Sequence, residues 1–300
     1  MIDQGAVVTY AQYNEDIILL GLLYDVEKGF YVDVGANYPV IDSVTKLFYD
    51  RGWSGVNIEP IVKLHNQIVK KRPLDINLNC GVSDKPGTLK FHESVNKPGH
   101  SSFLKSEESL DDVFVERKVP VRTLSDILDE YAPSSTIHFM KIDVEGYEYE
   151  VIKGNDWNRF RPEVLCIESN HTKKNWRTIL AAHGYKLFIA DGLNEYYIAK
   201  ESWHRTEGYA ERVINIDYRT LKQHQYQSWA EDTRLLKHLT KLNHSKEDVI
   251  QNILNEMELT VSKVDEVKAL SLKDVSYTQR VKRAVRGLTI DWLRYKRNKR

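Results

Sequence analysis

The sequence predicts an α/β protein with a doubly wound, mainly parallel sheet, an antiparallel terminal hairpin and a C-terminal α-helical extension. Three features lead to this fold class. Between about 30 and 200, short β-branched runs alternate with helical stretches, as in parallel sheets with crossover helices. The stretch 185–202 is typical of a hairpin that closes such a sheet. After about 205, glycine becomes rare and long, charged helical sequence takes over.

Each predicted element has its own signal. Apolar runs rich in Val and Ile mark the strands, and Gly52 and Gly184 end two of the helices. Thr123 or Ser125 suits the N-cap of a third helix. The predicted strands are 29–36, 54–60, 75–84, 137–146 and 162–170, with a hairpin arm at 87–94; the predicted helices are 43–52, 61–72, 121–131, 148–157 and 175–184. We predict a domain at 1–205 and a helical extension at 206–300.

Charge and cysteine content bear on where the protein works. The formal net charge is +0, yet 277–300 carries nine Lys and Arg residues against one Asp. Cys80 and Cys166 lie inside apolar runs, as buried thiols in a reducing compartment do. The first residues lack the pattern of a signal peptide, and no run approaches the roughly 18 apolar residues of a spanning helix. We therefore expect a cytoplasmic protein.

The turn after the first predicted strand indicates which cofactor fits. A dinucleotide site needs the pattern GxGxxG, because the pyrophosphate approaches bare backbone at a helix N-terminus. Here the three glycine positions hold Gly35, Asn37 and Val40. Asn37 tolerates a positive φ, but Val40 cannot replace a packing glycine, and Pro39 removes one N–H donor. The turn disfavours a pyrophosphate and a nicotinamide-dependent oxidoreductase.

A cofactor without phosphate, S-adenosylmethionine, fits these residues better. Asp33 at a strand end suits the ammonium of its methionine part, and Gly35 allows a close approach. Glu59, after the second strand, suits the two ribose hydroxyls, and Asp84 suits the adenine amino group. The alternative for each acid is a structural role, because strand-end carboxylates often belong to turns or helix caps.

Five ordered segments between about 9 and 200 carry a family resemblance: AQYNEDIILLGLL, YVDVGANYPVIDSVTKLFYDRGWSGVNIEP, NLNCGVSD, HSSFL and MKIDVEGYEYEVIKG. Together they resemble the FkbM-type family of S-adenosylmethionine-dependent O-methyltransferases. The resemblance implies a class I methyltransferase fold and methyl transfer to a hydroxyl. The form PVIDSVTKLFYDRGW resembles the branch that acts in bacterial glycan or polysaccharide assembly, which implies a sugar hydroxyl in a polysaccharide or glycolipid. The expected cofactor contacts are Gln12, Asp33, Gly35, Ala36, Asn37, Glu59, Pro60, Val82 and Asp143.

Two acidic strand ends supply the expected chemistry. A sugar hydroxyl is a weak acid, so a base or a metal ion should assist its attack. His171 is the first candidate base, and Glu145 and Glu168 are the other catalytic candidates. Asp143, Glu168 and Asn170 offer oxygen ligands for Mg²⁺. The alternative is that Asp143 binds the cofactor and Glu168 the substrate. Lys141, inside its strand, is not expected to be catalytic.

Three further segments have several open interpretations. The polar loop 96–104 is either a lid over the site or an ordinary surface loop. The heptad-like spacing in 246–268 is typical of a packed helix or of a homo-oligomer contact. The basic amphipathic stretch 280–296 suits the inner face of an anionic membrane, a partner protein, or the domain itself. We expect no nucleic-acid partner, because the basic residues are confined to this tail.

The alternative to an enzyme is a degenerate methyltransferase fold that acts as a scaffold in a membrane-associated glycan-assembly complex.

Overall fold

A seven-stranded sheet forms the centre of the computed structural model, which describes residues 7–104, 113–132, 134–170, 174–216 and 218–220. Its strand order is β10-β11-β9-β8-β2-β3-β4. The parallel strands are β2 (Phe30–Val34), β3 (Ser54–Ile58), β4 (Ile76–Leu78), β8 (Phe139–Ile142) and β9 (Val164–Glu168). In the closing hairpin, β11 (Asn194–Ala199) runs antiparallel to both β9 and β10 (Tyr185–Ala190). This arrangement confirms the predicted α/β fold class.

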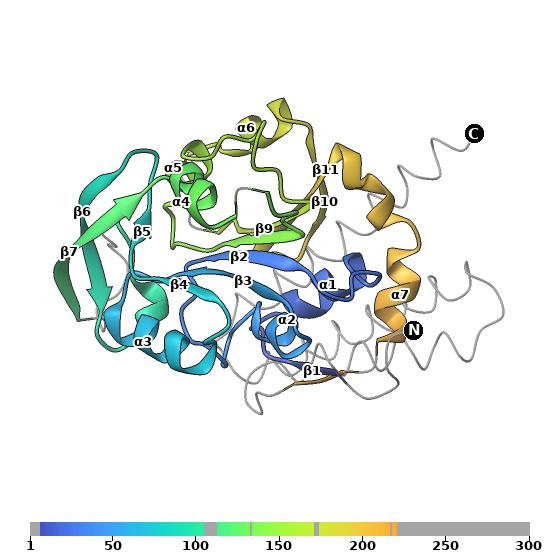
Figure 1. Cartoon of the computed structure of the whole chain (residues 1–300), viewed down its shortest axis with the longest axis horizontal. Helices are drawn as coiled ribbons and strands as arrows, with labels where there is room; N and C mark the ends of the chain where they lie inside the picture. The colour runs from blue at the N-terminus through green and yellow to red at the C-terminus, as the bar shows by residue number, and fades with distance from the viewer. Residues whose placement is uncertain (1–6, 105–112, 133, 171–173, 217, 221–300) are drawn as a thin grey trace, which may run out of the picture. The chain divides into compact units, whose positions relative to one another are not determined.

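Helices cover both faces of the sheet (Figure 1). On one face, α4 (Leu124–Tyr131), α5 (Glu148–Lys153) and α6 (Arg177–Ala182) share a hydrophobic cluster with Val32, Met140 and Ile167. On the other, α1 (Glu15–Leu22) and α2 (Lys46–Asp50) pack with Tyr31, Phe139 and Cys166. Because successive strand residues point to opposite faces, the apolar residues of β2, β8 and β9 contribute to both clusters. The helix α3 (Val62–Lys71) follows β3.

The predicted strand at 75–84 is wrong as a single element. It divides into β4 and β5 (Gly81–Val82), and β5 belongs to a second sheet of order β5-β7-β6. There β6 (Gly87–Ser94) pairs antiparallel with β7 (Phe114–Arg122), a strand that the sequence did not suggest because most of its side chains are exposed. Residues 79–80 separate the two strands, and a Cβ at Gly81 would lie 2.3 Å from the Phe103 ring. The predicted cap is confirmed, since Thr123 accepts a hydrogen bond from the Asp126 N–H at 3.0 Å.

The chain after 205 begins against the N-terminal elements. The 3₁₀ segment η2 (Lys200–Thr206) is followed by α7 (Tyr209–Asn215), and β12 (Tyr218–Thr220) pairs with β1 (Val7–Thr9). Helix α7 packs on α1, and a Cβ at Gly21 would lie 2.3 Å from Val213. The predicted segments 246–268 and 280–296 lie outside the described residues, and the division at 205 stays a prediction. Within the described part of the chain, every helix is too short or too polar to cross a membrane.

Candidate active site

The turn after β2 uses its backbone donors within the protein. The N–H groups of Gly35 and Ala36 donate to Ile58 O at 3.0 and 3.1 Å, and the Asn37 N–H donates to Glu59 Oε2 at 2.8 Å. Asn37 has a φ of 53°, as its residue type allows. A phosphate-binding turn offers such N–H groups to its ligand. Here three of them already have acceptors, which argues against a pyrophosphate at this position.

Gly35 makes its close approach to protein rather than to open space. Its φ is 81°, and a Cβ on it would lie 1.9 Å from Asp143 O, in the loop after β8. Any larger residue therefore has to displace the backbone that carries Asp143. Since the chain order reverses between β2 and β8, these two loops form the switch point where open α/β sheets bind ligands.

Polar side chains share one face of the sheet at this edge. Asp33 stands opposite Lys141 in the β2–β8 pair, and Glu168 stands opposite Asn194 in the β9–β11 pair. The residues two positions earlier on β2, β8 and β9 lie in the hydrophobic cluster with α1 and α2: Tyr31, Phe139 and Cys166. By strand alternation, Asp33, Lys141 and Glu168 face the same side. The predicted acids are thus gathered above that cluster.

Asp33 is buried at this edge of the sheet. Its side chain accepts a hydrogen bond from the Thr45 hydroxyl at 2.7 Å, and its other oxygen lies 3.6 Å from Lys141 Nζ. Lys141 also donates to Gly35 O at 2.8 Å and pairs with Asp143 Oδ2 at 3.2 Å. Burial opposes the charge of Lys141, but Asp143 and Asp33 together raise its pKa above the ordinary value. The strand residue Lys141, which is not expected to be catalytic, therefore contacts two carboxylates of the site.

A pocket of about 550 Å³, partly open to solvent, lies at this edge. The predicted cofactor residues that line it are Gly35, Asn37, Glu59, Pro60, Val82 and Asp143, and the candidate base Glu145 lines it too. Among the described residues, Gln12, Asp33, Ala36 and Glu168 are not lining residues, and Gln12 is exposed. Asp84, the expected adenine contact, pairs with Lys153 at 2.7 Å instead.

The loop 96–104 closes one side of this pocket. Pro98, Gly99, Ser101 and Phe103 line it, and a short 3₁₀ turn, η1 (Pro98–His100), lies within the loop. The Ser102 hydroxyl donates to Glu145 O at 2.8 Å, which joins the loop to the acidic strand end. The loop thus belongs to the wall of the site, and its role as a lid stays a prediction.

Glu59 lies in the pocket wall with both carboxylate oxygens engaged. Oε2 accepts from the Asn37 N–H, and Oε1 accepts from the Ile61 N–H at 2.7 Å. The side chain is buried, and burial raises its pKa to about 7 despite these two donors. Each oxygen has a further lone pair, so the carboxylate retains capacity for hydroxyl donors.

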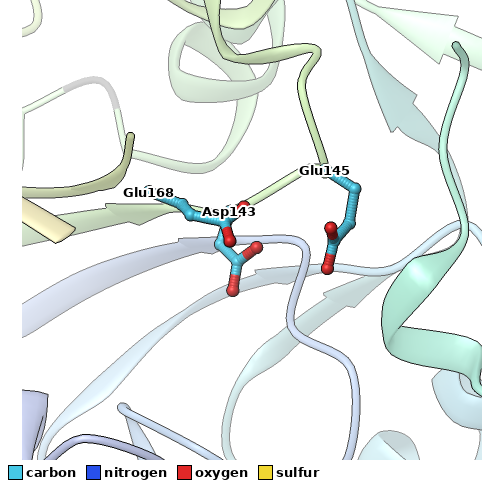
Figure 2. A group of neighbouring side chains, drawn as sticks. All are labelled: Asp143, Glu145 and Glu168. Atoms are coloured by element: carbon cyan, nitrogen blue, oxygen red, sulfur yellow. The ribbon is translucent and has the colours of Figure 1, made fainter. Parts of the chain in front are cut away.

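Three carboxylates meet beyond β8 and β9 (Figure 2). Asp143, Glu145 and Glu168 offer oxygens within 4.8 Å of one another. Burial, followed by Asp143, raises the pKa of Glu145 to about 8 and that of Glu168 to about 11. Glu168 Oε2 is buried without a hydrogen-bond partner. Of the predicted metal ligands, Asp143 and Glu168 lie together, whereas Asn170 is exposed; Glu145 is the third carboxylate. His171 lies outside the described residues.

The carboxylate set suits a hard divalent cation such as Mg²⁺ in ligand type. The unpartnered oxygen of Glu168 also fits a missing cationic or hydrogen-bonding group. Against this, the Lys141 ammonium already lies 3.2 Å from Asp143 Oδ2. The magnesium site therefore stays a prediction.

Sequence reasoning missed Glu148 as well as Lys141. Glu148 is buried, and its Oε1 accepts from the Val144 and Gly146 N–H groups at 3.2 and 3.0 Å. It thereby shapes the turn in which Glu145 takes a φ of 54°. The spacing of Lys141 two residues before Asp143, on one strand face, is the signal that would have placed its side chain at the site.

Comparisons with known proteins agree with this geometry. The model of the methyltransferase FkbM domain matches residues 33–187, which include both loops of the switch point. The methyltransferase sdnD of Sordaria araneosa is 31% identical over 194 residues, covering 52% of this chain and 74% of that protein. The family match includes Asp33, Glu59, Asp143 and Glu168. The chain belongs to the FkbM methyltransferase domain family.

Proposed function

We propose that this methyltransferase uses S-adenosylmethionine and transfers the methyl group to a hydroxyl oxygen. The observation that carries the proposal is the position of Glu59, buried in the pocket wall beside a turn whose N–H donors are already engaged. Such a wall accepts ribose hydroxyls and offers no cradle for phosphate. S-adenosylmethionine supplies an electrophilic methyl group on a sulfonium, and it needs no phosphate site.

Pocket residues suggest how the cofactor is oriented. We place the ribose at Glu59 and the adenine against Val82, which leads the methionine part toward Asp143. Lys141 Nζ lies 3.2 Å from Asp143 Oδ2, and we propose that the same carboxyl group pairs with the ammonium of the methionine part. Asp33 is assigned a supporting role, because Lys141 and Thr45 already contact it.

The acidic strand ends support transfer to a hydroxyl. In the proposed reaction the acceptor oxygen attacks the methyl carbon in line with the departing sulfur, and its proton passes to a protein base. Glu145 lines the pocket and is the base that the described residues favour, with His171 as the alternative. Glu168 lies within 4.8 Å of the other two carboxylate groups and can accept a second hydroxyl. Several carboxyl groups at one edge of the pocket suit an acceptor with several hydroxyl groups, so we propose a sugar hydroxyl of a polysaccharide or glycolipid.

The experiment that tests this proposal is a methyl-transfer assay with isotope-labelled S-adenosylmethionine and a panel of free sugars, glycosides and nucleotide sugars. We expect label in an O-methyl ether of one sugar class, located by mass spectrometry, and a strong loss of turnover in Glu145→Gln. Label on nitrogen or carbon would contradict the assigned chemistry. Turnover that survives EDTA would discard the magnesium prediction, for which Asp143, Glu145 and Glu168 would be the ligands.

The scaffold alternative makes a different prediction for the same pocket. A degenerate site should not bind S-adenosylmethionine, so calorimetry with millimolar ligand separates the two functions.

Three further proposals do not depend on the pocket: a cytoplasmic location, contact of 280–296 with the inner membrane face, and self-association through 246–268. Liposome sedimentation of the full chain and of a variant lacking 277–300 tests the membrane contact: an equal bound fraction would rule it out.

A further inference from the structure

A buried arginine holds the loop between β2 and α2. Arg72 follows α3 and is 1% exposed. Its guanidinium donates to Pro39 O at 2.9 Å, to the hydroxyls of Ser43 and Thr45, and to Asn57 Oδ1 at 3.5 Å. One side chain therefore joins three points of the segment 39–45 to strand β3. This segment leads directly from the turn that lines the pocket.

Thr45 connects that arginine to the floor of the site. Its hydroxyl accepts from Arg72 and donates to Asp33 at 2.7 Å. Asp33 faces Lys141, which in turn contacts Gly35 O and Asp143 Oδ2. The contacts form one continuous path from Arg72 to the carboxylate that lines the pocket.

The hydroxyl of Thr45 does not cap the helix that follows it. Thr45 is the N-cap residue of α2, where a threonine side chain normally accepts a hydrogen bond from the first turn. Here it makes no cap hydrogen bond and is fully buried among Arg72 and Asp33. The local stability of α2 thus does not account for a threonine at this position, whereas the path to Lys141 does.

Burial of these charges is costly for the fold. Asp33 and Lys141 are 1% and 7% exposed, and Asp33 Oδ1 has no hydrogen-bond partner. Replacing a buried ion pair by apolar side chains of similar volume often leaves the stability of a protein unchanged or raises it. The presence of these buried charges beside the switch point therefore suggests that they serve the site rather than the stability of the core.

We infer that Thr45 is a positioning residue for the methyl-donor site: by joining Arg72 to Asp33, it fixes Lys141 and hence the Gly35 turn and the Asp143 carboxylate. Asp33 then acts through Lys141 and not by contact with the cofactor. The part of this inference that is tested by S-adenosylmethionine binding rests on the proposed function. It also makes a prediction that needs no ligand, namely the protection of the turn amides.

Thr45→Val and Thr45→Ser form the central comparison. Valine keeps the shape of threonine but loses the hydroxyl, and serine keeps the hydroxyl. We expect Thr45→Val to weaken S-adenosylmethionine binding at least tenfold in calorimetry, and Thr45→Ser to stay within about threefold of the parent. Thr123→Ala, which removes the cap of α4, is the matched control: it lowers the melting temperature without changing affinity.

Hydrogen exchange supplies the second readout. The Gly35, Ala36 and Asn37 amides donate to Ile58 and Glu59, and their exchange should accelerate in Thr45→Val but not in Thr45→Ser or Thr123→Ala. If the parent protein binds no S-adenosylmethionine, the proposed function fails, and exchange alone decides the inference. Should Thr45→Val not fold, Asp33→Asn takes its place, with the same expected loss of affinity and protection. Parental affinity and protection in the variant, or equal losses in Thr45→Ser, would overturn the inference.

Discussion

Replacing Gly35 by alanine combines two separable perturbations. The first is the backbone, because Gly35 has a φ of 81°, a conformation that costs an L-residue roughly 1–2 kcal/mol. The second is contact, since the new Cβ would lie 1.9 Å from Asp143 O. Gly52 offers the matched control: its φ is 84°, and a Cβ there would meet nothing within 4 Å. The pair Gly35→Ala and Gly52→Ala thus isolates the contact.

The magnitude follows from the distances. Real Cβ atoms essentially never approach other heavy atoms within 3.0 Å, so the loop that carries Asp143 has to move by at least the difference from 1.9 Å, about 1.1 Å. A displacement of about 1 Å in a site can reduce turnover about 100-fold. We expect Gly52→Ala to lose roughly 1–2 kcal/mol of stability with normal affinity. Gly35→Ala should lose more stability, and at least tenfold in S-adenosylmethionine affinity.

Denaturant unfolding measures the stability of both variants, and calorimetry measures their affinity for S-adenosylmethionine. The reasoning is refuted if Gly35→Ala binds the ligand like the parent, because the contact with Asp143 would then not control the site. It is also refuted if Gly52→Ala loses as much affinity, because general destabilisation would then explain the effect.

Four more predictions concern the acids. The pKa of Glu59 is raised from 4.5 to about 7, so its contribution to stability is present below about 4.5 and lost as the pH rises to 7. Ribose hydroxyls favour the ionised form, so S-adenosylmethionine affinity should rise through pH 7 in the parent and be flat in Glu59→Gln; a flat parent curve would contradict this. Glu145→Gln should reduce turnover about 10²–10⁴-fold, as loss of a general base does. The pKa of Glu168 is raised, and glutamine resembles a protonated carboxyl group, so Glu168→Gln should bind the cofactor within about threefold of the parent. Parental turnover in Glu145→Gln would move the base to His171. Asp84→Asn breaks only the exposed pair with Lys153 and should leave affinity unchanged; a tenfold loss would return Asp84 to the adenine site.

Most of the fold was predictable because its signals are local. The alternation of apolar strands with helices predicted the parallel sheet, and the stretch 185–202 predicted the closing hairpin. Strand β7 was not predicted because its side chains alternate weakly between buried and exposed, and most are exposed. Its pairing with β6, rather than burial, defines it as a strand. The division of 75–84 was not predictable from local sequence because β4 pairs with β3 whereas β5 pairs with β7, a strand about 40 residues further along the chain.

The site was predictable in its residues but less so in their roles. Strand ends predicted that Glu59, Asp143 and Glu145 line one pocket. The role of Asp33 was not accessible in this way, because its partner Thr45 lies 12 residues away, beyond a loop. The contacts of the strand residue Lys141 with Asp33 and Asp143 were not predictable, since a sequence does not show how far a long side chain reaches along a sheet face.

The most direct test of the account is the structure of the full chain with S-adenosylhomocysteine, the product of methyl transfer. The account predicts the ribose hydroxyls within hydrogen-bond distance of Glu59 and the amino-acid end beside Asp143. It also predicts that Asp33 stays bound to Thr45 and does not touch the ligand. A ligand outside this pocket, or one whose ribose lies away from Glu59, would contradict the central claim.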